Sequence, residues 1–283
     1  MNTKQITGLR EIADQYALFV VDQWGVLHNG EAPLPGAVEA LRHLKDSGAA
    51  VALLSNSGKR VTDSYHRLST LGFDRSLYDL AITSGEQVYQ GLLTREDPFY
   101  ANLGPRFLMF AWDSNRGIVE GTGFDEVSDV EEADFILCAG TDRSNLESYK
   151  PILQRALERD LPLTCANPDR VSVQPDGSLK ICPGAIAELY EGMGGRVRWH
   201  GKPGLDAYRS IRDQTGVNGP GLGVGDSLAH DIAGANAAGM DGLFITGGIH
   251  QKDLTDPPTV QSVLDLGWQH QAVPTHFCTG FRW

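Results

Sequence analysis

The stretch Tyr16-Ala17-Leu18-Phe19-Val20-Val21-Asp22-Gln23-Trp24-Gly25-Val26-Leu27 places a carboxylate directly after an apolar run. The run has the length and composition of a buried strand, and Asp22 opens the turn that follows it. Open α/β sheets bind ligands and do chemistry at the carboxyl ends of their strands. Asp22 is therefore a candidate nucleophile, although a lone aspartate after a strand more often only caps the turn.

Three further segments repeat this arrangement of an apolar strand followed by polar side chains. Hydroxyl, amide and backbone N–H groups at a junction between strand and helix suit an anion, and a lysine or a second aspartate there adds charge. Each segment alone is common in soluble proteins, but four in this order indicate one shared site. The three are Ala49–Leu54 followed by Ser55-Asn56-Ser57-Gly58, Val197–Pro203 with Lys202, and Leu222–Gly225 followed by Asp226, Ser227 and Asp231.

Strands and helices alternate along the chain, which favours a parallel sheet flanked by helices. From about Gln87 a second α/β unit is predicted, with strands at Phe107–Phe110, Phe135–Cys138 and Leu161–Cys165 and a helix through Ser144–Arg159. We expect a core formed by residues 1–86 and 183–283 and an inserted α/β cap domain formed by residues 87–182. An inserted cap can exclude water from a pocket at the strand ends and choose the substrate.

Together these motifs resemble the haloacid dehalogenase (HAD) superfamily, and within it subclass IIA, the phosphatase-like members with a large α/β cap. The resemblance implies a Rossmann-like, doubly wound parallel sheet core with an inserted smaller cap, and Mg²⁺-dependent hydrolysis of a small phosphomonoester. The residues that carry it are Asp22-Gln23-Trp24-Gly25-Val26-Leu27, Leu54-Ser55-Asn56, Gly201-Lys202-Pro203 and Gly225-Asp226 to Asp231, with Ala166-Asn167-Pro168-Asp169 and Pro183-Gly184-Ala185-Ile186 typical of the subclass.

To catalyse phosphoryl transfer, a protein mainly has to position the reacting groups and stabilise negative charge on the oxygens of the transferring phosphoryl group. Attack by Asp22 on phosphorus would form an aspartyl-phosphate and split the hydrolysis into two easier steps. Because two anions repel, cations must lie nearby. Asp22, Asp226 and the backbone carbonyl of Trp24 are the hard oxygen ligands that Mg²⁺ takes.

The remaining polar residues have supporting roles in this interpretation. Lys202 is expected to neutralise the nucleophile and the phosphate, and Ser55 to donate a hydrogen bond to the transferring group. Asp231 either orients the metal's ligands or pairs with Lys202. The other predicted site residues are Asn56 and Ser57 on the phosphate, Ser227 beside the metal ligands, and Asn167 and Asp169, which either touch the substrate or hold the cap to the core.

Trp24 departs from the family pattern, in which phosphatases usually carry a second aspartate two residues after the nucleophile. That aspartate protonates the leaving group and later deprotonates the attacking water, and an indole can do neither. Its loss removes about 10²–10⁴ in rate unless another donor replaces it. For each of three histidines a purely structural role is favoured, and if one of them is catalytic, His28 is the first choice, ahead of His200 and His230.

Two alternatives stay open at this level. The substitution at Trp24 also fits a degenerate scaffold that binds a phosphorylated ligand without turning it over. It fits a metal-independent dehalogenase as well, since those enzymes carry an aromatic residue there, but the aspartate pair Asp226 and Asp231 argues for a metal.

The composition of the chain limits the classes of molecule that it is expected to bind. The 283 residues carry a net charge of −12, which opposes binding to nucleic acid or to an anionic membrane surface. The four cysteines form no metal-type pairs, no run approaches a membrane span, and the N-terminus lacks the apolar core of a signal peptide. We therefore expect a cytoplasmic protein that acts on a small phosphorylated metabolite. Caps of this size often contribute to dimers in the resembled subclass, so a homodimer is an open expectation.

Overall fold

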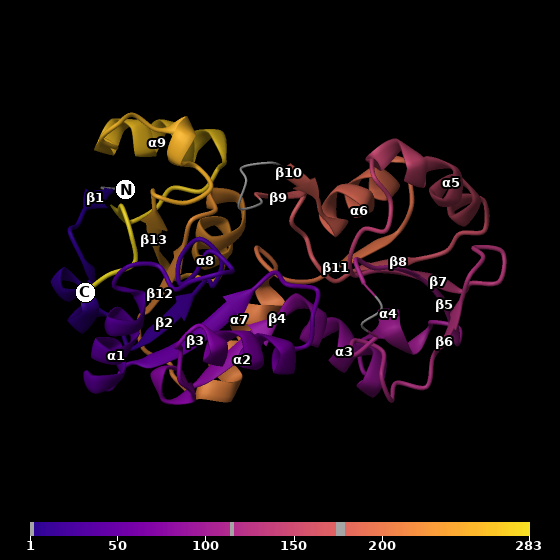
Figure 1. The fold of residues 1–283 in the computed structure, drawn as a ribbon, viewed down its shortest axis with the longest axis horizontal. Helices are drawn as coiled ribbons and strands as arrows, with labels where there is room; N and C mark the ends of the chain where they lie inside the picture. Colours follow the sequence, from indigo (N-terminus) through magenta and orange to yellow (C-terminus); the bar gives the residue numbers. More distant parts are fainter. Residues whose placement is uncertain (1–2, 114–115, 174–178) are drawn as a thin grey trace. The chain divides into compact units, whose positions relative to one another are not determined.

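The computed structural model describes residues 3–113, 116–173 and 179–283, and the chain forms two compact units, each built on its own parallel sheet (Figure 1). The first unit consists of Met1–Ser55, Ser64–Ile82 and Lys202–Trp283. The second unit consists of Asn56–Asp63 and Thr83–Gly201. The chain thus leaves the first unit and returns to it, as an inserted domain requires.

The first unit contains a seven-stranded sheet in the order β1-β14-β13-β12-β2-β3-β4. The pairs from β1 across to β3 are parallel. From β2 the chain builds outward through β3 and β4, then returns to the other side of β2 with β12, β13 and β14, so the sheet is doubly wound and the predicted Rossmann-like core is confirmed. The strands are β1 (Lys4–Gln5), β2 (Leu18–Val21), β3 (Ala50–Ser55), β4 (Leu80–Thr83), β12 (Gly221–Gly225), β13 (Asp241–Ile245) and β14 (His276–Cys278).

Helices cover the sheet because its central strands are apolar on both faces. All four residues of β2 are buried, as a parallel strand between two helical layers requires. Leu18 and Val20 pack with Tyr208 and Ile211 of α7 in one core cluster. The helices that include residues of this unit are α1 (Ala37–Asp46), α2 (Val61–Thr70, across the division between the units), α7 (Leu205–Thr215), α8 (Ala233–Ala237) and α9 (Val260–Gln269), with 3-10 turns at Leu9–Glu11, Ala13–Gln15, Arg75–Leu77 and Gln251–Asp253 and a π-helical turn at Leu228–Ile232.

The second unit is built on a five-stranded parallel sheet in the order β11-β8-β7-β5-β6, with a separate antiparallel pair, β9 and β10. Two buried clusters form its core, one with Ile186 and Tyr190 of α6 and the other with Val88 and Leu92 of α3. Its strands are β5 (Arg106–Phe110), β6 (Asp125–Val127), β7 (Phe135–Cys138), β8 (Leu163–Cys165), β9 (Val171–Val173), β10 (Leu179–Ile181) and β11 (Val197–Trp199); its helices are α3 (Ser84–Thr94), α4 (Pro98–Ala101), a 3-10 turn at Leu146–Tyr149, α5 (Lys150–Glu158) and α6 (Pro183–Gly192).

The second unit is wider than the predicted cap of residues 87–182. It includes α6 and β11, which the sequence analysis gave to the core, because β11 pairs with β8 and α6 packs into the same apolar cluster. The first unit resumes only at Lys202. A three-residue strand such as β11 can complete either sheet, so its sequence does not decide which.

The predicted helix through Ser144–Arg159 is shorter in the structure. It begins as a 3-10 turn capped by the Asn145 side chain, and α5 starts at Lys150 with Pro151 in its first turn. Proline lacks the N–H that a longer helix would need at that position.

The four cysteines are buried free thiols. Among the residues that the structure describes, no helix combines the length and the apolar composition needed to cross a bilayer.

Candidate active site

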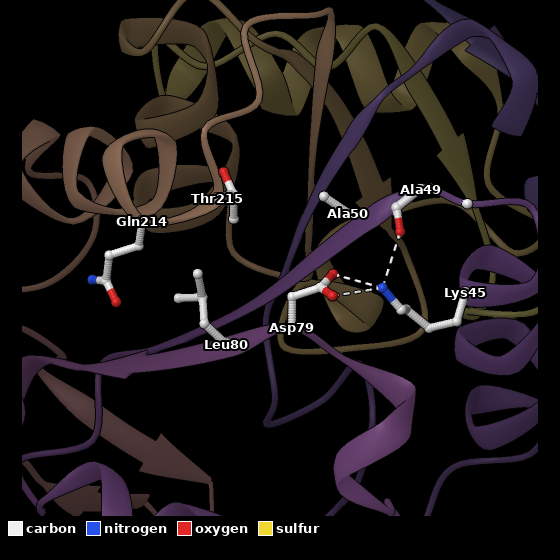
Figure 2. A pocket seen from close by; sticks show the side chains of 8 residues that line it. Lys45, Ala49, Ala50, Asp79, Leu80, Gln214 and Thr215 are labelled. Atoms are coloured by element: carbon white, nitrogen blue, oxygen red, sulfur yellow. Dashed lines mark hydrogen bonds and ion pairs between the residues drawn. The ribbon is translucent and has the colours of Figure 1, made fainter.

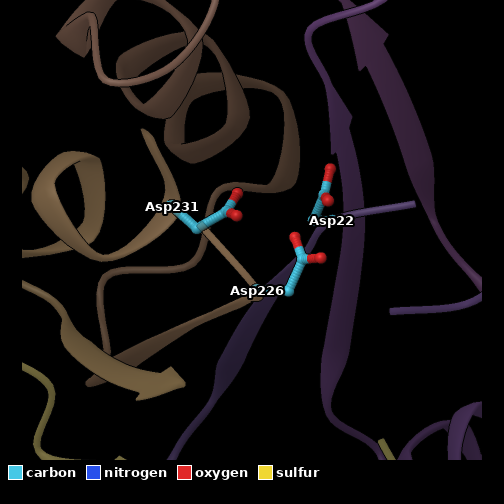
Figure 3. Close-up of side chains that lie close together, drawn as sticks. All are labelled: Asp22, Asp226 and Asp231. Atoms are coloured by element: carbon cyan, nitrogen blue, oxygen red, sulfur yellow. The ribbon is translucent and has the colours of Figure 1, made fainter. Parts of the chain in front are cut away.

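Three aspartates of the first unit converge at the carboxyl edge of its sheet (Figure 3). Asp22 follows β2 and Asp226 follows β12, and these neighbouring strands are parallel, with Val21 opposite Val224. Asp231 comes from the π-helical turn after β12. One oxygen of each carboxylate lies within 4.8 Å of the other two. The strand order therefore brings together two aspartates that lie far apart in the sequence.

Lys202 binds this cluster with its ammonium group, and its side chain is almost fully buried. Its Nζ lies 2.5 Å from Asp22 Oδ1 and 2.6 Å from Asp231 Oδ1. The same nitrogen donates to the carbonyl oxygen of Leu54, at 3.2 Å. Since an ammonium has three hydrogens, these three acceptors can use all of them and fix the position of the Asp22 carboxylate.

The cluster is rich in acidic groups. With all three carboxylates ionised, they and the one ammonium would sum to a local charge of −2, and all four side chains are buried. Burial raises the pKa of Asp22 well above its usual range despite the opposing charge of Lys202. Burial, reinforced by the charge of Asp231, raises the pKa of Asp226 to about 7. A bound divalent cation would offset this excess charge.

The surroundings of Asp226 suit a hard cation. Its Oδ2 accepts a hydrogen bond of 2.9 Å from the Ile249 N–H, which orients the carboxylate. Gly25 and Gly248 lie so close that a Cβ on either would overlap the carboxylate, and Gly25 has a left-handed φ of 78°. Every candidate ligand is a carboxylate or carbonyl oxygen, the donor set that Mg²⁺ prefers. The residues present therefore fit a magnesium ion.

Asp231 is held from two sides. Its Oδ1 pairs with Lys202, as the sequence analysis allowed, and its Oδ2 accepts a hydrogen bond of 3.0 Å from the backbone N–H of Ser227. Ser227 thus contacts the cluster through its main chain. A Cβ at Gly225 would overlap the Asp231 carboxylate, so the end of β12 also requires a residue without a side chain.

Trp24 lies beside the cluster without joining it through its side chain. Gly25, the residue after it, lies against the Asp226 carboxylate, so the main chain next to Trp24 is close to the cluster. The indole packs over Gly30, leaves 42% of the residue's surface exposed, and meets the ring of His28 edge-on at 5.9 Å between centroids.

His28 is enclosed rather than open to a substrate. Its residue surface is 2% exposed, its Nδ1 accepts a hydrogen bond of 3.1 Å from the Gly30 N–H, and its ring lies near Phe73. Burial, aided by the charge of Arg67, lowers its pKa to about 4, so the ring is neutral at pH 7. This geometry supports the structural interpretation of His28 and not the proton donor.

Ser55 ends β3 in the first unit and is half-buried. The next residue, Asn56, belongs to the second unit, where its amide donates to Asp169 Oδ1 at 2.8 Å. Asp169 in turn donates its backbone N–H to Asn167 Oδ1 at 2.9 Å. The Oγ of Ser57 accepts from the Lys59 N–H at 3.3 Å. Sequence reasoning named Asn56, Asn167 and Asp169 separately and missed that they form one network within the second unit.

Other groups at the cluster were also missed. The Leu54 carbonyl and the loop Gly247-Gly248-Ile249 both contact its charged side chains. The loop had a signal, since two glycines follow the apolar strand that ends at Ile245. The main-chain carbonyl had none, because every residue has one.

A cavity of about 410 Å³ in the first unit lies away from this cluster (Figure 2). Its walls include Ala50 and Leu80, the first residues of β3 and β4, so it opens at the amino edge of the sheet. Asp79 there pairs with Lys45 at 2.7 Å and accepts the Val51 N–H. With its charges already paired, this cavity lacks the convergent reactive groups of the aspartate cluster.

Two family models match the chain. One is described as haloacid dehalogenase-like hydrolase and matches residues 19–125; the other, described as HAD-hydrolase-like, matches residues 199–266. The first covers Asp22 and Ser55, and the second covers Lys202, Asp226 and Asp231. Both matches lie on the segments from which the resemblance was inferred.

Known proteins resemble the whole chain. Chronophin of Bos taurus is 25% identical over 283 residues, covering 95% of this chain and 92% of chronophin. The crystal structure of a hydrolase of the haloacid dehalogenase-like family from Brucella suis 1330 superposes with a TM-score of 0.81 and 27% identity, covering 98% of this chain and 99% of that one. Glycerol phosphate phosphatase of Mycobacterium tuberculosis, solved in complex with magnesium, gives a TM-score of 0.64 and 23% identity, covering 84% and 70%.

Proposed function

Because the chain belongs to the haloacid dehalogenase-like hydrolases, we propose that it is a Mg²⁺-dependent phosphomonoester hydrolase that works through an aspartyl-phosphate at Asp22. One observation carries the proposal. The buried Asp22 carboxylate is held by Lys202 within one coordination shell's span of Asp226. A turn-capping aspartate needs neither of these neighbours.

The candidate magnesium ligands are the carboxylates of Asp22 and Asp226 and the backbone carbonyl of Trp24. When bound, the ion would stabilise negative charge on the transferring phosphoryl group. Support comes from the excess charge of the cluster and from the glycerol phosphate phosphatase relative, whose structure contains magnesium.

The protein's own groups position the reaction. Lys202 holds Asp22 Oδ1, which leaves Oδ2 to attack phosphorus, and the ammonium reduces the repulsion between the two anions. Ser55, at the end of β3, is the candidate hydrogen-bond donor to the phosphoryl oxygens. Asp231 keeps Lys202 in place from the other side.

We infer that the substrate is a small phosphorylated metabolite, such as a sugar phosphate or a nucleotide-like monophosphate. The relative named glycerol phosphate phosphatase supports a small ester. The net charge of −12 opposes binding of a polyanionic partner. A small phosphate can still bind, because the positive charges of Lys202 and of a bound metal ion dominate the electrostatic potential inside the site.

The test compares wild type with Asp22→Asn on a panel of phosphate esters, with Mg²⁺ and with a chelator. Phosphate release should require both Asp22 and the metal. Asp79→Asn, whose ion pair lies at the amino edge of the same sheet, is the matched control and should retain activity. Equal release under all conditions would reject the proposal. Tight ligand binding with no turnover over hours would favour the scaffold alternative, and halide release in chelator would favour a dehalogenase.

A further inference from the structure

We propose that this site is selective for phosphate esters whose leaving group departs as a stabilised, conjugated anion, aryl phosphates above all, and that Trp24 is the residue that selects them. The inference rests on the proposed phosphatase function, and within small phosphorylated metabolites it favours aryl esters over sugar phosphates and nucleotides, whose leaving groups are alcohols. It depends on two features of the first unit. The first is a pair of exposed apolar residues, called the rim here, beside the aspartate cluster; the second is that the groups able to protonate a leaving oxygen are already bound to other partners.

The rim consists of Trp24 and Ile249. They are 42% and 46% exposed, two of only seven large apolar residues exposed among those that the structure describes. They come from separate loops whose glycines, Gly25 and Gly248, both lie against the carboxylate of Asp226. Two of the seven thus flank the carboxylate of Asp226. Exposure of an apolar side chain to water does not stabilise the fold, so this placement suggests a role in binding.

The indole of Trp24 is held on one side and open on the other. It rests on Gly30, where a Cβ would overlap the ring, and it meets His28 edge-on. His28 is fixed in turn by the Gly30 N–H. A ring restrained in this way presents a flat apolar surface, and stacking an aromatic group on such a surface favours binding beyond the burial of apolar area alone.

The described groups of the first unit that are nearest to Asp22 are committed to other partners, and Asp226 would be ionised as a ligand of the bound metal ion. The Lys202 ammonium contacts Asp22, Asp231 and the Leu54 carbonyl. His28 is enclosed, and the indole that meets it edge-on cannot act as an acid. An unassisted leaving group must carry the negative charge itself.

The leaving group's own acidity then decides the rate. A phenol has a pKa of about 10, like tyrosine, whereas an alkanol is nearly as weak an acid as water, with a pKa of about 15.7. A positioned general acid contributes about 10²–10⁴ in rate, and an alkyl ester needs most of that help. Aryl esters need little of it.

The two steps balance without a protein acid. The Asp22 oxygen forms a bond to phosphorus while the P–O bond to the aryl group breaks, and the phenolate leaves with the electron pair. Water then attacks the phosphorus of the aspartyl-phosphate and releases inorganic phosphate, the Asp22 carboxylate and one proton to solvent. Dephosphorylation also lacks a base, so it should limit turnover for good leaving groups.

The experiment uses three esters of similar size with Mg²⁺: phenyl phosphate, benzyl phosphate and cyclohexyl phosphate. Phenyl and benzyl share an aromatic ring, whereas benzyl and cyclohexyl share a poor leaving group. Wild type should show a kcat/KM for phenyl phosphate at least about 100-fold above the other two. Benzyl phosphate should still bind several-fold more tightly than cyclohexyl phosphate, measured as competitive inhibition. Phenyl phosphate should give a burst of one phenol per Asp22.

Three variants separate the binding of the aromatic ring from the dependence of turnover on the leaving group. Trp24→Leu should abolish the difference in binding between benzyl and cyclohexyl phosphate and keep the preference for phenyl phosphate in turnover. Trp24→Asp, which supplies a carboxyl group, should narrow that preference. Trp268→Leu, on α9 and also exposed, is the matched control and should change neither.

The wild-type comparison alone can overturn the proposal, whatever the variants' folding. Hydrolysis of cyclohexyl phosphate within tenfold of phenyl phosphate would mean that a proton donor is present after all. An unchanged binding difference in folded Trp24→Leu would refute the role of the ring. Both results leave Asp22-dependent hydrolysis intact, whereas failure to hydrolyse any ester would reject the phosphatase itself and this inference with it.

Discussion

Replacing Lys202 with methionine should destabilise the first unit strongly, because the change removes the ammonium and keeps an apolar chain of similar length. The residue is 4% exposed, and its Nζ contacts Asp22 and Asp231 at 2.5 and 2.6 Å. Breaking a buried ion pair by removing one partner costs about 3–5 kcal/mol, since the remaining charges are buried without compensation. For a unit of this size each kcal/mol lowers Tm by about 2–4 °C, so we expect a fall of about 6–20 °C.

Magnesium should reverse part of this loss. In the variant, three carboxylates lie together with no ammonium between them, so a divalent cation gains more there than in wild type. A ligand that binds only the folded state stabilises it according to its concentration relative to Kd. The assay is urea and thermal unfolding followed by circular dichroism, in chelator and in saturating Mg²⁺.

Lys45→Met is the matched control. Lys45 pairs with Asp79 at 2.7 Å, but this pair is partly exposed, so its loss should cost less than about 1 kcal/mol and should not respond to Mg²⁺. Equal destabilisation of the two variants, or equal stabilisation of both by Mg²⁺, would refute the reasoning that burial and convergence on the aspartates make Lys202 different.

Three further predictions concern pH, backbone and the second unit. The pKa of Asp226 is about 7 in the folded state, above its unfolded value, so between about pH 4 and 7 the folded state binds more protons. In chelator the free energy of unfolding should therefore fall as pH rises, by up to about 1.4 kcal/mol per pH unit from this group. In urea titrations Asp226→Asn should reduce that slope and leave the part due to Asp22, whose pKa is also raised. Gly25→Ala should weaken Mg²⁺ binding measured by calorimetry, because its Cβ would overlap the Asp226 carboxylate, whereas Gly72→Ala, with a similar φ of 84° and open space, should only lose stability. Tyr100→Phe removes the hydroxyl that bonds His200 Nε2 at 2.6 Å and should destabilise the second unit by about 1–3 kcal/mol; an unchanged urea midpoint would contradict this.

Some elements could be predicted because the signal is local. Phe135–Cys138 is a strand with the bounds expected from its apolar run, and the strand expected at Phe107–Phe110 begins one residue earlier, at Arg106. Proline and caps are local too, but their effect on the start of α5 was not anticipated.

The division between the units could not be predicted in the same way. The strand Val197–Trp199 has one short apolar run that suits either sheet, and only its pairing with β8 assigns it to the second unit. The choice between the two interpretations of His28 also needed the tertiary structure. Its position in the nucleophile loop left a role as proton donor open, and the enclosed side chain near Trp24 and Phe73 supports the structural role that was favoured from the sequence.

The sequence by itself determined the doubly wound core and the polar residues at its strand ends, because period, composition and order are properties of neighbouring residues. It also determined that position 24 lacks an acid. Only the tertiary structure decided that Asp22, Asp226 and Asp231 share one charged cluster with Lys202, and that Asn56 bonds Asp169 instead of standing alone. The pairing of Lys202 with Asp22 and the bond between Asn56 and Asp169 join residues more than a hundred positions apart, and their geometry depends on strand order and burial that no local pattern specifies.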